Sequence, residues 1–161
     1  MFTLVDIRNI AIQIEKNGEA SYRNAAESTD HSEIVKIFEM MATDEQKHAQ
    51  WFEKMIVPTT TAPKDARIEE MGRELLQGMM AQQTFSLQKE RLAAAQDALD
   101  ALRQSIEFEN DTILFYEMLH SFLDDTATMR QVELIIEEER SHIDKLNEII
   151  RMVDAEQQTI R

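Results

Sequence analysis

The chain aligns with itself, without gaps, when it is shifted by 94 residues, and this internal repeat restricts its possible folds more than any other feature. Most of the paired positions share only polarity. The identical pairs include Ile12 and Ile106, Glu15 and Glu109, Tyr22 and Tyr116, Asp30 and Asp124, Glu45 and Glu139, and His48 and His142. Identity therefore falls on residues that can do chemistry and on a helix cap, whereas two units with only a common hydrophobic pattern would share mainly Leu and Ile. The repeat predicts two equivalent units that each contribute half of one site.

Each unit of the repeat has the sequence pattern of a helical hairpin. Only 3 glycines and 2 prolines occur among the 161 residues, and apolar residues recur at helical spacing. In the first unit the pattern predicts one helix over about 3–28. Asp30, followed three residues later by Glu33, predicts a capping box at the start of a second helix that carries Met55 and Ile56. In the second unit a helix is predicted from about residue 97 to Phe122. After the turn "LDDTAT" a last helix is predicted to about residue 155.

The break between the two units is the segment "VPTTTAPK", which holds both prolines. The predicted layout is hairpin one at about 3–56, a long and partly helical crossover at about 57–96, and hairpin two at about 97–155. A long crossover between two antiparallel hairpins is one of the known ways to close a four-helix bundle. The sequence thus predicts an all-α fold and a single domain over 1–161, long enough to bury a core.

Charge and composition exclude several classes of function. The net charge of -14 and the pI of about 4.6 disfavour binding to nucleic acid or to an anionic membrane surface. Because the chain has no cysteine, disulfides, thiolate metal sites, iron-sulfur clusters and thiol catalysis are excluded. The sequence shows no secretory signal and no apolar run long enough to span a bilayer. We therefore expect a soluble cytoplasmic protein.

Two glutamate-histidine pairs carry the chemistry that the sequence indicates. Residues three apart lie on the same face of a helix, so Glu45 with His48, or Glu139 with His142, can hold one ion between them. A single pair of this kind arises easily by chance in an acidic helical protein. Apolar neighbours indicate that both pairs face inward. They are Ala42 and Ala49 around the first pair, and Ile135, Ile136, Ile143 and Leu146 around the second. Glu15 and Glu109 have similar apolar neighbours, so each of the four helices offers one carboxylate to the interior.

Four buried carboxylates require a compensating charge, because the desolvation of each ion costs several kcal/mol and like charges add to that cost. Two divalent cations would neutralise four glutamates, and neutral His48 and His142 would complete the ligand set. Carboxylate oxygens with one imidazole per ion suit iron or manganese, and zinc is a further possible occupant. The sequence predicts two iron ions at this site.

The ligand pattern resembles the ferritin-like di-iron carboxylate superfamily, in which two helices each give a Glu and two others each give a Glu-x-x-His. Here the motifs are Glu15, "EQKH" from Glu45 to His48, Glu109, and "ERSH" from Glu139 to His142. Within the superfamily, "IEKNGEASYRNAAE" and "IEFENDTILFYEML" look most like rubrerythrins. The resemblance implies Tyr22 and Tyr116 as groups that hydrogen-bond a ligand carboxylate. Packed core aromatics are the alternative.

The resemblance to rubrerythrins also implies an activity, which is the reduction of hydrogen peroxide or dioxygen at a di-iron centre in a homodimer. A chain without cysteine has no rubredoxin domain, so the electrons would come from a separate protein such as a rubredoxin. Family members often carry an extra glutamate one turn beyond a ligand, at the positions where this chain has Gly18 and Thr112. Glu19 is a lower-ranked candidate to replace that ligand. Two alternatives remain: an iron-oxidising and iron-sequestering protein of the ferritin or bacterioferritin kind, and a metal-binding bundle without turnover.

Overall fold

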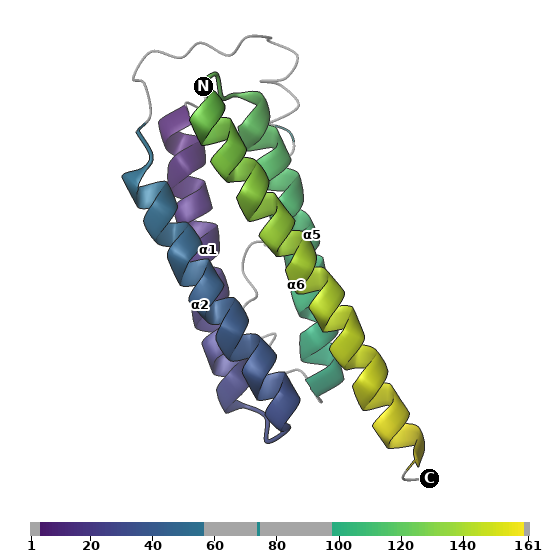
Figure 1. The fold of residues 1–161 in the computed structure, drawn as a ribbon. Helices are drawn as coiled ribbons and strands as arrows, with labels where there is room; N and C mark the ends of the chain where they lie inside the picture. Colours follow the sequence, from purple (N-terminus) through teal and green to yellow (C-terminus); the bar gives the residue numbers. More distant parts are fainter. Residues whose placement is uncertain (1–3, 57–73, 75–97, 160–161) are drawn as a thin grey trace.

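In the computed structural model, residues 4–56, 74 and 98–159 are described, and they form a bundle of four long helices. The helices are α1 (Leu4–Glu27), α2 (Ser32–Lys54), α5 (Ala98–Ser121) and α6 (Thr126–Thr159). Helix α1 packs mainly on α2 and α5 mainly on α6, and smaller contacts join α2 to α6 and α1 to α5. The two hairpins thus lie side by side, as Figure 1 shows. The predicted all-α four-helix bundle is confirmed. The predicted crossover at about 57–96 lies almost wholly outside the described residues.

The turn into α2 corrects one prediction about helix capping. Its N-cap residue is His31, whose side chain makes no capping hydrogen bond, and whose carbonyl accepts the Val35 N–H. The predicted capping box at Asp30 is therefore wrong, because Asp30 stands one residue before the position that can cap. At the start of α6 it is Asp125 that caps, since its carboxylate accepts hydrogen bonds from the backbone N–H and the hydroxyl of Thr128.

The helix ends also differ from the expected ones. Helix α2 ends at Lys54, and Ile56 is 90% exposed, so its predicted place in the helix is wrong. Helix α6 continues to Thr159, beyond the predicted end at about residue 155. Residues 155–159 are exposed, and within them Glu156 lies 2.9 Å from Nε2 of His31 in the α1–α2 turn. A side-chain contact thus links the last turn of α6 to the opposite hairpin.

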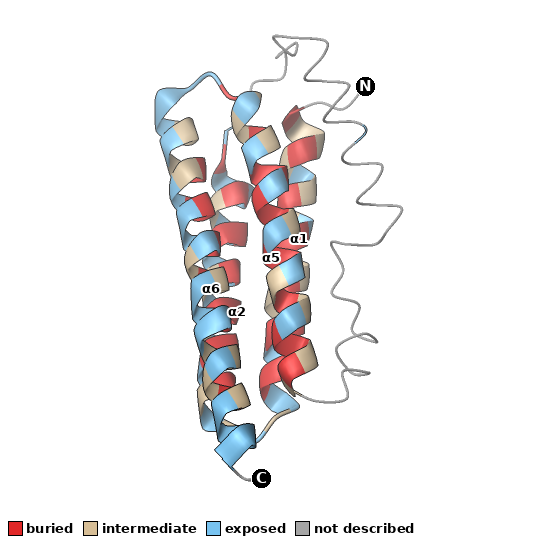
Figure 2. Ribbon diagram, turned by 90° about the vertical axis from the view of Figure 1, so that its right-hand side faces the viewer, coloured by how far each residue is buried: buried red, intermediate tan, exposed pale blue. Residues whose placement is uncertain are grey.

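The core lies between the four helices, and the buried faces point toward one another (Figure 2). Its largest fully buried side chains include Tyr22, Tyr116, Phe38, Phe52, Phe108 and Phe115. Among the described residues, no helix is both long and apolar enough to cross a membrane. The interior also contains ionisable groups, and these define the candidate site.

Candidate metal centre

Six ionisable side chains meet inside the bundle, and we call them the carboxylate cluster. They are Glu15 from α1, Glu45 and His48 from α2, Glu109 from α5, and Glu139 and His142 from α6. All four glutamates are 0% exposed, and the histidines are 4% and 1% exposed. The prediction that each helix contributes one carboxylate to the interior is confirmed.

The carboxylate cluster divides into two overlapping groups that could each hold a metal ion. One group is Glu15, Glu45, His48 and Glu139, and the other is Glu45, Glu109, Glu139 and His142. Within each group the candidate ligand atoms all lie within 4.8 Å of one another. Glu45 and Glu139 belong to both groups. The two glutamates paired with histidines are therefore in position to bridge two ions.

The histidines turn the same ring nitrogen toward the carboxylates. Nδ1 of His48 lies 3.1 Å from Glu139 Oε1 and 3.4 Å from Glu15 Oε2. Nδ1 of His142 lies 3.0 Å from Glu139 Oε2 and 3.4 Å from Glu109 Oε1. Nδ1 is thus the nitrogen that each ring offers to a metal, and Nε2 is left to bond elsewhere.

The Nε2 atoms are held by two acids that the sequence reasoning missed. Glu138 lies 2.6 Å from Nε2 of His48, and Asp44 lies 3.0 Å from Nε2 of His142. Each acid comes from the hairpin opposite to its histidine. A carboxylate on the far nitrogen of a metal-binding histidine fixes the tautomer and the orientation of the ring. The signal was present in the sequence, because Asp44 and Glu138 are also separated by the 94-residue shift, but they are alike rather than identical.

The two buried tyrosines bond across the bundle in the same crosswise manner. The Tyr22 hydroxyl on α1 donates to Glu109 Oε1 on α5 at 2.7 Å, and the Tyr116 hydroxyl on α5 donates to Glu15 Oε1 on α1. Burial, followed by the charge of the bonded glutamate, raises the pKa of both hydroxyls well above the ordinary value of 10.0. Both tyrosines therefore keep their protons and donate hydrogen bonds to Glu109 and Glu15.

Without metal, the cluster carries more negative charge than its surroundings can balance. Burial and the neighbouring charge of Glu139 raise the pKa of Glu45 and Glu109 well above 4.5. Burial also opposes the charged form of His142, but its hydrogen bonds to Asp44, Glu109 and Glu139 raise its pKa to about 12. In the absence of metal, Glu45, Glu109 and His142 therefore bind protons more tightly than they would in water.

Several buried ligand atoms of the cluster have no hydrogen-bond partner. These are Glu15 Oε2, both oxygens of Glu45, Glu109 Oε2, Glu139 Oε1 and His48 Nδ1. Buried polar groups are nearly always satisfied, so a set of unpaired atoms facing one another needs a binding partner. Oxygen donors with one imidazole nitrogen on each side fit divalent iron, manganese or zinc.

Three further positions singled out from the sequence lie outside the two groups. Glu19 forms an ion pair with Arg23 at 3.0 Å on the same helix, so it is not brought to the cluster. Gly18 has no side chain to offer a ligand. The Thr112 hydroxyl donates to the backbone oxygen of Phe108 at 2.9 Å. None of these three positions therefore adds a fifth carboxylate to the cluster.

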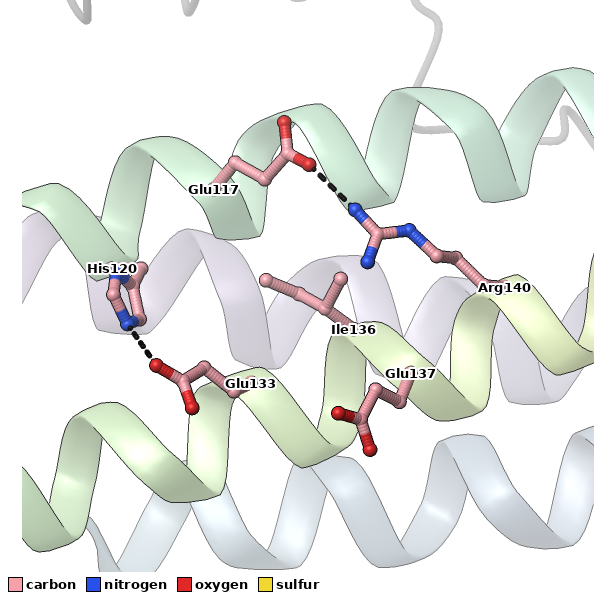
Figure 3. A pocket seen from close by; sticks show the side chains of 6 residues that line it. All are labelled: Glu117, His120, Glu133, Ile136, Glu137 and Arg140. Atoms are coloured by element: carbon pink, nitrogen blue, oxygen red, sulfur yellow. Dashed lines mark hydrogen bonds and ion pairs between the residues drawn. The ribbon is translucent and has the colours of Figure 1, made fainter.

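A surface hollow of about 310 Å³ lies apart from the cluster, along α5 and α6 (Figure 3). It is lined by Glu117, His120, Glu133, Ile136, Glu137 and Arg140. Its charges are already paired, since His120 lies 3.0 Å from Glu133 and Arg140 lies 2.9 Å from Glu117. The unpaired ligand atoms are therefore in the bundle interior and not in this hollow.

Comparisons with known proteins agree with this architecture. A family model described as Rubrerythrin matches residues 6–150. A crystal structure from Thermotoga maritima, described as that of a ferritin-like diiron-carboxylate protein, superposes with a TM-score of 0.66. That protein is 24% identical, and the match covers 93% of this chain and 95% of the other. A comparison with curated proteins gave no match. At this identity the structural likeness shows a common fold.

Proposed function

The chain belongs to the rubrerythrin family, and from this premise we propose that the carboxylate cluster binds two iron ions and reduces hydrogen peroxide or dioxygen. The observation that carries the proposal is the presence of two four-residue ligand groups that share Glu45 and Glu139. A shared pair of carboxylates would let the cluster hold two ions at neighbouring positions, where they could supply two-electron redox chemistry. Glu15 and His48 would complete one metal position, and Glu109 and His142 the other.

Charge balance supports two divalent ions in this cluster. Four glutamates carry four negative charges and two divalent cations carry four positive ones, so the loaded site is neutral when both histidines are neutral. Neutrality matters here because an uncompensated buried charge costs several kcal/mol. Manganese or zinc would satisfy the same count, and the redox reaction is the reason to propose iron.

The surrounding residues prepare the cluster for a redox reaction. When bound, two ferrous ions supply the two electrons that, with two protons, reduce hydrogen peroxide to two water molecules. Asp44 and Glu138 hold the imidazole rings so that Nδ1 stays aimed at the metal positions. Tyr22 and Tyr116 hold Glu109 and Glu15, and their raised pKa values keep both hydroxyls protonated. Complete burial of the glutamates keeps bulk water away from the ligands.

The proposal also includes a partner and an assembly. Turnover would require a source of electrons, and the 161 residues include no cysteine that could hold an iron-sulfur centre. We propose a separate electron-donor protein, such as a rubredoxin, that meets a homodimer of this chain in the cytoplasm. Light scattering tests the assembly, because a dimer supports the redox enzyme and a large cage supports iron storage.

Metal analysis with stopped-flow mixing tests the reaction. We expect about two iron ions per chain, near-ultraviolet absorption after oxidation, and fast oxidation of the ferrous protein by peroxide or dioxygen. Glu45→Ala and Glu139→Ala should each abolish this oxidation. If the purified protein binds well under two ions, and both substitutions leave metal content and Tm unchanged, the proposal is rejected. Two tightly bound ions without fast oxidation would instead favour a metal-binding bundle without turnover.

A further inference from the structure

Gly18 lies against the carboxylate of Glu45, with no room between them for a side chain. Gly18 is on α1, one turn after Glu15. A Cβ atom at this position would lie 2.7 Å from Oε2 of Glu45, and 3.3 Å from Cδ of Glu45 and from Cε1 of Phe108. A separation of 2.7 Å is too short for a carbon next to that oxygen. The carboxylate of Glu45 therefore occupies space that exists because residue 18 is glycine.

Glu45 is also the least restrained of the four cluster carboxylates. Neither of its oxygens receives a hydrogen bond from a hydroxyl, an amide or an imidazole, and the nearest imidazole nitrogen, His142 Nδ1, is 3.7 Å away. Its one hydrogen-bonding contact is with the carboxyl group of Glu15, and that bond exists only while one of the two carboxyl groups is protonated. The other three are each tied by at least one group. Tyr116 holds Glu15, Tyr22 holds Glu109, and His142 Nδ1 lies 3.0 Å from Glu139 Oε2.

The repeat makes this difference between the two halves of the site clear. Glu45 and Glu139 are equivalent by the 94-residue shift, and so are Gly18 and Thr112. Thr112 is fully buried and its hydroxyl is bonded to the backbone of α5. A residue without a side chain thus occurs at this position in one half only. It is Gly18, and it lies beside Glu45, the carboxylate that receives no hydrogen bond from a tyrosine or a histidine.

We propose that Gly18 is a positioning residue for Glu45, and that the space it leaves lets this carboxylate change its binding mode between the two metal positions. Glu45 is then the ligand that rearranges when metal binds or changes charge, while Glu139 stays in place. The proposal rests on the function proposed above, because it requires two ions at the cluster. It adds that Glu45 and Glu139, which are equivalent in the sequence repeat, have different roles at the site.

Gly18→Ala tests the proposal, with Thr112→Ala as the matched control at the equivalent position. Alanine favours a helix interior over glycine, and the atoms it displaces are at the flexible end of Glu45, so the metal-free variant should keep or increase its Tm. Its added methyl group should displace the Glu45 carboxylate and weaken Fe(II) binding about tenfold or more in an anaerobic titration. The near-ultraviolet band of the oxidised centre should shift as well. Thr112→Ala should leave both readouts unchanged.

The outcomes separate this inference from the proposed function. If wild-type protein fails to bind two ions, the proposed function fails. If wild type binds two ions and Gly18→Ala binds them with the same affinity and spectrum, only the inference is overturned. Equal weakening by Thr112→Ala overturns it too. If Gly18→Ala does not fold, crystal structures of the reduced and the oxidised wild-type protein decide. A Glu45 carboxylate that moves while Glu139 stays supports the inference, and an unmoved Glu45 overturns it.

Discussion

The two hairpins are identical at the six cluster residues and at the two tyrosines that bond them, and they differ almost everywhere else in the core. Each hairpin supplies the same glutamates, histidine and tyrosine, and each sends its tyrosine and one acid to the opposite half. Core positions exchange one apolar residue for another. Examples are Ile14 against Phe108, Met41 against Ile135, and Phe52 against Leu146, all of them buried. A core tolerates such exchanges when total volume is kept, whereas a ligand or hydrogen bond needs particular atoms.

The two halves of the site also differ in the solvent exposure of the acids that bond Nε2 of the histidines, which we call the outer acids. The side chain of Asp44 is 26% exposed and lies 3.7 Å from Lys47, whereas that of Glu138 is 58% exposed. The counterpart of Lys47 is Ser141, which has no charge to pair with Glu138. The two halves are therefore closely symmetric in the six cluster residues and less symmetric in the outer acids. Substitutions at equivalent positions of the two halves test this difference.

The largest expected effect separates shared from unshared carboxylates. Glu45→Ala and Glu139→Ala should each reduce metal content from about two ions per chain to well under one, because each removes a ligand from both groups. Glu15→Ala and Glu109→Ala should leave about one ion, since each removes a ligand from one group only. Inductively coupled plasma analysis of the four variants measures this. An equal loss in all four would contradict the division into shared and unshared ligands.

The outer acids should give the next largest effect. Asp44→Asn should weaken metal binding by about 10- to 100-fold, as loss of a carboxylate behind a metal-binding histidine usually does. Glu138→Gln should cost less, because water can replace part of a bond whose acceptor is 58% exposed. Isothermal titration with Mn(II) compares the two affinities, and Glu137→Gln, on the outside of α6, is the control. A larger loss of Mn(II) affinity for Glu138→Gln than for Asp44→Asn would show that solvent exposure does not determine which acid matters more.

Metal removal should make stability depend on pH in a direction that the cluster determines. The pKa of His142 is raised from 6.5 to about 12, so above pH 6.5 the folded metal-free protein holds a proton that the unfolded chain releases. The free energy of unfolding should therefore fall as pH rises from 6.5 toward 12. The raised pKa values of Glu45 and Glu109 act in the same direction from pH 4.5 upward.

Bound metal takes the place of these protons, so the metal-bound protein should lose less stability as pH rises. Melting curves recorded with Mn(II) and with a chelator across this pH range measure both forms. We expect the difference in Tm between them to widen with pH. A metal-free Tm that stays constant or rises above pH 6.5 would contradict the protonated cluster.

The residues that meet in the carboxylate cluster could be predicted from the sequence because two independent constraints coincide on them. Helical spacing puts Glu45 beside His48, and the repeat gives the same pair again at Glu139 and His142. The crosswise bonds could not be predicted in the same way, because they depend on how the hairpins pack. Glu138, for example, reaches His48 across 90 residues of chain. Spacing within one helix contains no information on that contact.

Local features near the helix ends were less predictable for another reason. A cap works at a single position, and a shift of one residue in each turn places His31 instead of Asp30, and Asp125 instead of Asp124, at the N-cap. Of these two N-cap residues, Asp125 alone makes a capping hydrogen bond through its side chain. The position of Glu19, one turn after Glu15, makes it a candidate ligand, but it forms an ion pair with Arg23 along α1. The spacing of four residues makes this pair possible, but the sequence does not tell whether Glu19 bonds Arg23 or turns to the cluster.

The smallest expected effect concerns these two turns, where the repeat suggested equivalence and the structure shows a difference. Asp125→Ala removes the carboxylate that bonds the N–H and hydroxyl of Thr128, so the Tm should fall by about 2 to 4 °C. Asp30→Ala should leave the Tm nearly unchanged, because the side chain at the N-cap position of α2 is His31. Differential scanning calorimetry on both variants measures the difference. Equal losses would mean that Asp30 also caps its helix, which would contradict the difference between the two turns.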